Sequence, residues 1–132
     1  RQQGFLHQVL HVRAAIEQTI QTYFDGLYEG NADKLASVFH PGSALTYDNA
    51  GTVMVWPLAD WLKAVRERPS PQAKGLARDD AILLIDQSGP TTALVKVKCQ
   101  IPPRYFTDYL NLLCIGGQWK VAQQVFATEV RS

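Results

Sequence analysis

Apolar positions near the start of the chain recur every three or four residues. This spacing places them on one side of an α-helix, and that side comprises Val12, Ile16, Ile20, Tyr23, Phe24, Leu27 and Tyr28. Gly30 is suited to ending this helix, and Asn31 can cap the start of another. The pattern therefore predicts a long amphipathic helix followed by a short one, which ends at residues 40–42.

Two short strands and a third helix are predicted next. Residues 44–47 and 53–56 flank a segment typical of a tight turn, Asp48-Asn49-Ala50-Gly51. Pro57 fits the first turn of a helix. The apolar side of this third helix comprises Leu58, Trp61, Leu62 and Val65. Arg68 and Pro69 then begin a polar loop.

From residue 81 the apolar period changes to that of strands. Extended segments are predicted over 81–85, 91–101, 105–115 and 119–126. In the second segment, Ala93, Val95, Val97, Cys99 and Ile101 alternate with Leu94, Lys96, Lys98 and Gln100. Such alternation indicates an antiparallel sheet with one buried face. Because the helices come first and no βαβ alternation follows, the pattern predicts an α+β fold.

Composition narrows the class of protein without naming its chemistry. The chain has 132 residues, 46% of them hydrophobic and 19% charged, as expected for one folded domain. A formal net charge of +1 lacks the basic excess of nucleic-acid binders, and no apolar run is long enough to span a membrane. We therefore expect neither nucleic acid nor membrane as a partner. No leader pattern is recognisable, so we expect a cytoplasmic protein.

Four segments carry a resemblance to a known family. Residues 20–31 (IQTYFDGLYEGN) and 35–41 (LASVFHP) resemble the opening of the putative lumazine-binding family, and residues 106–110 (FTDYL) and 117–121 (GQWKV) resemble its last hairpin. This family belongs to the nuclear-transport-factor-2-like superfamily, which also includes ketosteroid isomerase and polyketide cyclases. The resemblance covers about residues 12–127. It implies a single domain over 1–132 with the cystatin-like cone, in which N-terminal helices pack into a strongly curved antiparallel sheet.

The cone fold implies a cavity between the helices and the sheet. Candidate wall residues, and hence candidate ligand contacts, are Phe24, Tyr28, Trp56, Trp61, Tyr105 and Phe106. This favours binding of a small, partly aromatic or apolar molecule, with no metal and no cofactor expected. The alternative is that these side chains fill the core. The protein would then be a homodimeric interaction module with a filled cavity.

Similarity to ketosteroid isomerase implies an enzymatic alternative, in which Tyr23, Asp48 and Asp108 are the candidate catalytic residues. An isomerase, dehydratase or cyclase needs a carboxylate to move a proton and donors to stabilise an oxyanion. Asp108 shares the buried face of its strand with Phe106 and Leu110, so its carboxyl must be hydrogen-bonded, paired or protonated. Against a catalytic role, Asp48 fits a solvent-facing turn and Asp108 fits a structural position. The sequence leaves open whether the protein is an enzyme.

Two groups of surface residues suggest possible partners. The outer face of the sheet is predicted to carry Leu94, Lys96, Lys98 and Gln100 with Tyr109, Leu113, Ala122 and Phe126. This mixture of apolar and polar groups fits a two-fold interface, and the family resemblance implies a homodimer through this face. Basic residues also gather around the third helix and the loop after it, namely Lys63, Arg66, Arg68, Lys74 and Arg78. They fit either attraction of an anion or, with Glu67, Asp79 and Asp80 among them, a solvated face.

Overall fold

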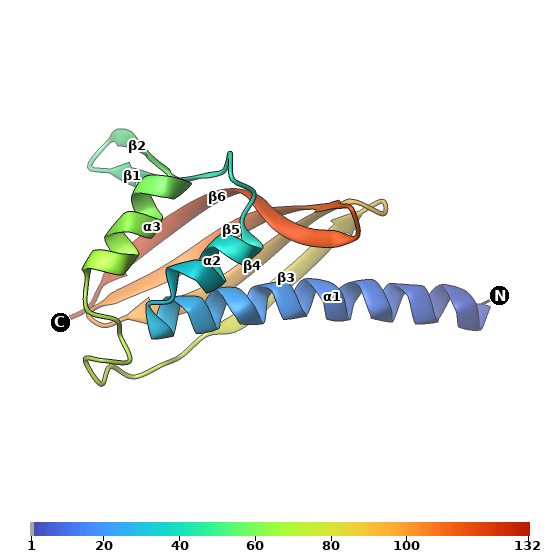
Figure 1. Ribbon diagram of the computed structural model, residues 1–132, viewed down its shortest axis with the longest axis horizontal. Helices are drawn as coiled ribbons and strands as arrows, with labels where there is room; N and C mark the ends of the chain where they lie inside the picture. The colour runs from blue at the N-terminus through green and yellow to red at the C-terminus, as the bar shows by residue number, and fades with distance from the viewer. Residues whose placement is uncertain (1) are drawn as a thin grey trace.

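A computed structural model describes the backbone of residues 2–132, with the side chains of residue 4 and of residues 6–132. Over this range the chain forms three helices and six strands (Figure 1). The helices are α1 (Gln2–Glu29), α2 (Ala32–Val38) and α3 (Leu58–Glu67). The strands are β1 (Ala44–Asn49), β2 (Thr52–Pro57), β3 (Ala81–Ser88), β4 (Thr92–Ile101), β5 (Arg104–Ile115) and β6 (Gln118–Val130).

All six strands form one sheet, in the order β2-β1-β6-β5-β4-β3. The sheet is open, with β2 and β3 at its edges. Its neighbours are antiparallel except for β1 and β6, which pair in parallel at Leu45–Gln124 and Thr46–Val125. The predicted α+β class is therefore confirmed, whereas a wholly antiparallel sheet is wrong at this one pair. The hairpin of β1 and β2 thus joins the sheet beside β6, its last strand in the chain.

The three helices lie over one face of the sheet, and α1 runs along its length (Figure 1). The predicted boundary between α1 and α2 is confirmed in detail. Gly30 adopts a φ of 65°, and the Asn31 side chain accepts a hydrogen bond from the Lys34 backbone N–H at 3.0 Å. Among the described residues, no helix combines the length and the apolar character that crossing a membrane requires.

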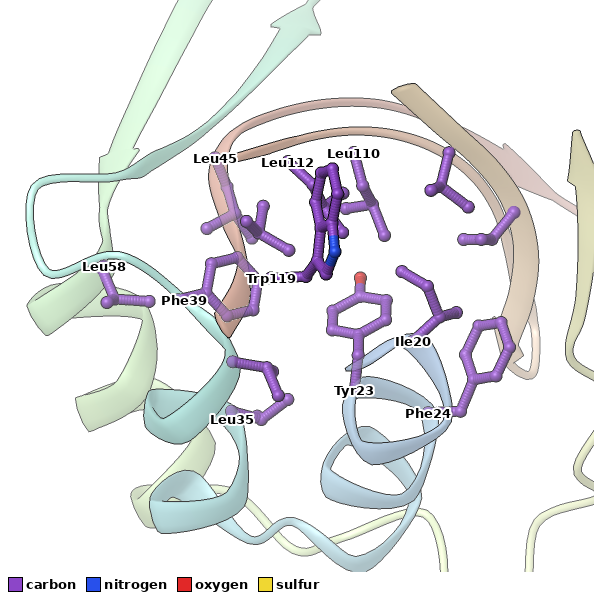
Figure 2. Close-up of a cluster of buried hydrophobic side chains, with 14 of the residues drawn as sticks. Ile20, Tyr23, Phe24, Leu35, Phe39, Leu45, Leu58, Leu110, Leu112 and Trp119 are labelled. Carbon is purple, nitrogen blue, oxygen red and sulfur yellow. The ribbon is translucent and has the colours of Figure 1, made fainter. Parts of the chain in front are cut away.

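The hydrophobic core lies between α1, α2 and the central strands, as Figure 2 shows. The helices contribute Ile16, Ile20 and Leu35, and the strands contribute Val95 and Leu110, all fully buried. Tyr23 extends from α1 into this space, with its hydroxyl toward the strands (Figure 2). The core thus places one polar atom from α1 against the inner face of the sheet.

The outer face of the sheet differs from the prediction at Phe126. A β-bulge shifts the register between β5 and β6 at Asn111/Leu112, so that Leu112 pairs with Val121 while Asn111 pairs with Gln123. The extra residue reverses the alternation along β6. Phe126 consequently faces inward, where its ring stacks on Tyr47 at 4.9 Å. Tyr109 and Leu113 are exposed on the outer face, and the homodimer through that face stays a prediction.

Candidate functional site

A cavity of about 440 Å³ lies between the helices and the inner face of the sheet. Its polar lining includes Asp108 and Gln124, which are both almost fully buried. Eight of its wall residues are aromatic and come from α1, α3 and four strands: Tyr23, Phe24, Tyr28, Tyr47, Trp56, Trp61, Phe106 and Phe126. The side chains of the fold therefore leave the cone unfilled.

Three strands and one helix converge on a buried polar cluster in this cavity. Tyr23 comes from α1, Cys99 from β4, Asp108 from β5 and Gln124 from β6. The alternation of β5 brings Asp108 inward with Phe106 and Leu110, in agreement with the sequence pattern. Gln124 faces inward because it follows the bulge. We call these four residues the polar cluster.

Hydrogen bonds connect the members of the polar cluster. The Tyr23 hydroxyl donates to Asp108 Oδ2 at 2.6 Å, and the Cys99 thiol donates to the same oxygen at 3.4 Å. Gln124 Nε2 donates to the Tyr23 hydroxyl oxygen at 3.2 Å. Within the described part of the chain, Gln124 Oε1 is buried without a hydrogen-bond partner. The cluster is thus ordered by its own bonds yet keeps unused acceptor capacity.

Burial dominates the acid–base behaviour of the polar cluster. Only 2% of Asp108 is exposed, and loss of solvation raises the pKa of its carboxyl, although the bonds from Tyr23 and Cys99 act in the opposite direction. Burial and the nearby Asp108 carboxylate also raise the pKa of the Tyr23 hydroxyl and of the Cys99 thiol. The cluster therefore favours neutral forms of all three groups.

Replacing Asp108 with asparagine is expected to stabilise the protein progressively more as pH rises. With its pKa raised in the folded state, Asp108 contributes its full stability only below its usual pKa of 3.8, and this contribution is lost as pH rises through the folded value. The asparagine amide does not ionise. The difference in the free energy of unfolding, variant minus wild type, should therefore grow above about pH 4, with a slope of up to about 1.4 kcal/mol per pH unit.

Urea denaturation at a series of pH values measures this difference. Asp48→Asn is the matched control, because it also removes one carboxylate, from an exposed position near the end of β1. A pH-independent difference for Asp108→Asn, or one that falls as pH rises, would contradict a raised pKa at this position.

Two predicted site residues lie away from the cavity. Asp48 is exposed near the end of β1, where its carboxylate accepts a hydrogen bond from the Gly51 backbone N–H of the following turn at 2.8 Å. Tyr105 lies on the other side of β5 from Phe106, since neighbouring residues of a strand alternate. The Arg131 guanidinium covers its ring at 4.1 Å. Neither residue joins Tyr23 and Asp108, so a three-residue catalytic arrangement that includes Asp48 is not formed.

The other predicted contacts do line the cavity, namely Phe24, Tyr28, Trp56, Trp61 and Phe106. Sequence reasoning overlooked Gln124 and Tyr47 and placed Phe126 on the wrong face. Gln124 could have been noticed as a polar residue in a strand whose apolar residues alternate. The bulge, however, makes it impossible to infer from this alternation which face of the sheet Gln124 occupies. Tyr47 sits beside Asp48 in β1, where alternation would have favoured one of the two for the interior.

Solved structures of similar proteins share the fold of this chain. An NTF2-like protein of unknown function from Shewanella baltica OS155 is 21% identical, with a TM-score of 0.81 over 92% of this chain and 97% of that one. Another, from Silicibacter pomeroyi DSS-3, is 16% identical, with a TM-score of 0.81 over 92% of this chain and 98% of that one. These likenesses show the predicted nuclear-transport-factor-2-like fold.

Comparisons of sequence identify one similar protein and one family. The aldolase FrzH from Cladobotryum sp. is 24% identical over 114 residues, or 85% of this chain and 87% of the aldolase. The family model described as "Putative lumazine-binding" matches residues 11–127. Because that match spans almost the whole domain, including every member of the polar cluster, the chain belongs to the putative lumazine-binding family.

Proposed function

We propose that this protein binds a small, flat and mostly aromatic molecule in the cavity, with a hydroxyl or carbonyl group of the ligand against the polar cluster. Aromatic walls provide contact area to a flat ligand, and a few polar groups fix its orientation. The volume of about 440 Å³ is within the range of small-molecule sites. Membership of a family described as lumazine-binding supports a ligand of this class.

One observation carries the proposal: buried hydrogen-bonding capacity lies among the aromatic walls of the cavity. Gln124 Oε1 has no partner in the described structure, and an unsatisfied buried acceptor costs stability. Tyr23 and Cys99 both donate their hydrogen bonds to Asp108 Oδ2, so neither of them contacts Asp108 Oδ1. A ligand hydroxyl can donate to these oxygens or, when Asp108 is protonated, accept from it.

We expect 2-naphthol to bind as a probe with one site per chain, because it combines two fused aromatic rings with one hydroxyl. Thr128 lines the cavity from β6, so Thr128→Trp should place an indole in the space that the probe needs. Binding should weaken by at least about tenfold, since the indole and the probe would overlap and the probe would lose its contacts with the walls. Isothermal titration calorimetry measures both affinities.

Glu129→Trp is the matched control, because it adds the same side chain to the next residue of β6, on the opposite face. This control should bind 2-naphthol within about twofold of the wild type, as surface substitutions have small effects. No binding to the wild type, or equal binding by the two tryptophan variants, would count against a ligand site in the cavity.

A second candidate function is acid–base catalysis on a carbonyl compound, as in an isomerase, dehydratase or cyclase. The observation that favours it is the Asp108 carboxyl, with its raised pKa, in contact with a tyrosine hydroxyl inside an apolar cavity. The 24% identical relative is an aldolase, and aldol chemistry also requires proton transfer. The pH dependence expected for Asp108→Asn reports the pKa on which such chemistry depends. An interaction module with a filled cavity gains no support from a cavity of about 440 Å³.

A further inference from the structure

The opening of the cavity is rich in charged side chains, and most of them neutralise one another. The Arg78 guanidinium contacts Asp25 Oδ1 at 2.6 Å and Asp80 Oδ2 at 2.7 Å. Asp79 accepts from Lys98 Nζ at 3.3 Å. The two carboxylates that line the opening, Asp79 and Asp80, are therefore already compensated by cations of the chain itself.

Arg68 and Arg104 also line the cavity, and no carboxylate among the described residues lies within ion-pair distance of either. Arg68 follows the last residue of α3, and Arg104 is the first residue of β5. Both are exposed, which places them at the opening rather than in the buried interior. We call these two residues the arginine pair.

The two charges of the arginine pair face the same cavity, since both residues line it. Partial burial, and then the positive charge of Arg104, lower the pKa of Arg68. The Arg68 guanidinium nevertheless keeps its positive charge at neutral pH, as arginine does in proteins. Two like charges held together are unfavourable, so an anion placed between them would relieve their repulsion.

We propose that the ligand class is an aromatic carboxylate, whose carboxylate binds the arginine pair while its hydroxyl or carbonyl group reaches the polar cluster. This inference rests on the proposed function, since both ends of the ligand occupy the same cavity. Guanidinium groups match the planar geometry of a carboxylate and form two parallel hydrogen bonds with it. The neutralised Asp79 and Asp80 offer little repulsion to an incoming anion.

The test compares two probes that differ in one group. 6-Hydroxy-2-naphthoate carries a carboxylate opposite its hydroxyl, and 6-hydroxy-2-naphthamide carries a neutral amide of the same shape. By calorimetry at neutral pH and low salt, the wild type should bind the carboxylate about tenfold more tightly than the amide, because charge-assisted hydrogen bonds are stronger than neutral ones. The preference should shrink at about 0.5 M NaCl, since salt screens exposed charges.

Substitutions test whether the arginine pair causes the preference for the carboxylate over the amide. Arg68→Gln and Arg104→Gln should each reduce it, and the double variant should bind the two probes within about twofold of each other. Arg66→Gln is the matched control, because Arg66 lies on α3 and contacts Asp33 at 3.8 Å, away from this cavity. It should keep the full preference.

The outcomes separate the two proposals. If 2-naphthol and the amide bind but the carboxylate binds no more tightly, the carboxylate inference is overturned and the proposed function stands. A preference that survives in the double variant likewise overturns the role of the arginine pair. If neither 2-naphthol nor either naphthalene derivative binds the wild type, the proposed function itself fails.

Discussion

Replacing Trp61 with alanine is expected to lower the free energy of unfolding by about 3–5 kcal/mol, the range for removal of a buried aromatic side chain. Only 4% of Trp61 is exposed, and its ring lies 5.4 Å from that of Phe39. Trp61 also forms part of the cavity wall. Its loss removes contacts between α3 and the core that no neighbouring side chain can replace, because the space opens into an existing cavity. Urea denaturation followed by far-ultraviolet circular dichroism measures the change.

Trp56→Ala is the matched control for this substitution. Trp56 lines the same cavity but is only half-buried, at the end of β2. Its removal should cost about 1–2 kcal/mol, in proportion to the smaller apolar area that it buries. Both variants should lose affinity for 2-naphthol, whereas Trp61→Ala should lose far more stability. Equal losses of stability would contradict the view that Trp61 supports the core while Trp56 serves mainly the cavity.

The sequence pattern predicted the parts of the fold that depend on local periodicity. Residues that repeat at helical spacing, such as Ile16, Ile20 and Tyr23, became the buried side of α1. The alternation of β5 correctly placed Asp108 on the inner face, and its role there remains a prediction. Gly30 and Asn31 marked the boundary between α1 and α2, because their conformational and hydrogen-bonding preferences act within a few residues.

The remaining errors share a physical cause, which is that the cavity is made by contacts distant in sequence. A single bulge between β5 and β6 reversed the direction of Phe126 and turned Gln124 inward, and no local pattern marks that extra residue. Tyr105 was placed with Phe106, although adjacent positions on a strand face opposite sides. Arg68 follows α3 and Arg104 begins β5, so the two arginines are distant in sequence. Only the folded chain shows that both line the same cavity.

Gly30→Ala is expected to cost about 2–4 kcal/mol, through two effects that add. Gly30 has a φ of 65°, a conformation that costs a residue with a Cβ about 1–2 kcal/mol. A Cβ at this position would also lie 2.7 Å from the Cβ of Ser70, in the loop after α3. That loop cannot move away freely, since the Gln72 backbone N–H donates to the Tyr28 carbonyl at 3.0 Å and the Tyr28 hydroxyl donates to the Leu76 carbonyl at 3.1 Å.

Gly116→Ala separates the two effects, because Gly116 has a φ of 60° but nothing within 4 Å of an added Cβ. It should show only the conformational cost, about 1–2 kcal/mol, so the excess for Gly30→Ala measures the contact with Ser70. If that contact is the cause, adding Ser70→Gly to Gly30→Ala should recover about 1 kcal/mol relative to the sum of the single variants. Equal costs at the two glycines, together with strictly additive single variants, would mean that the loop yields to the new side chain. The loop carries Arg68 and Pro71 to the cavity opening, so in that case Gly30→Ala should alter affinity for 6-hydroxy-2-naphthoate in addition to the conformational cost.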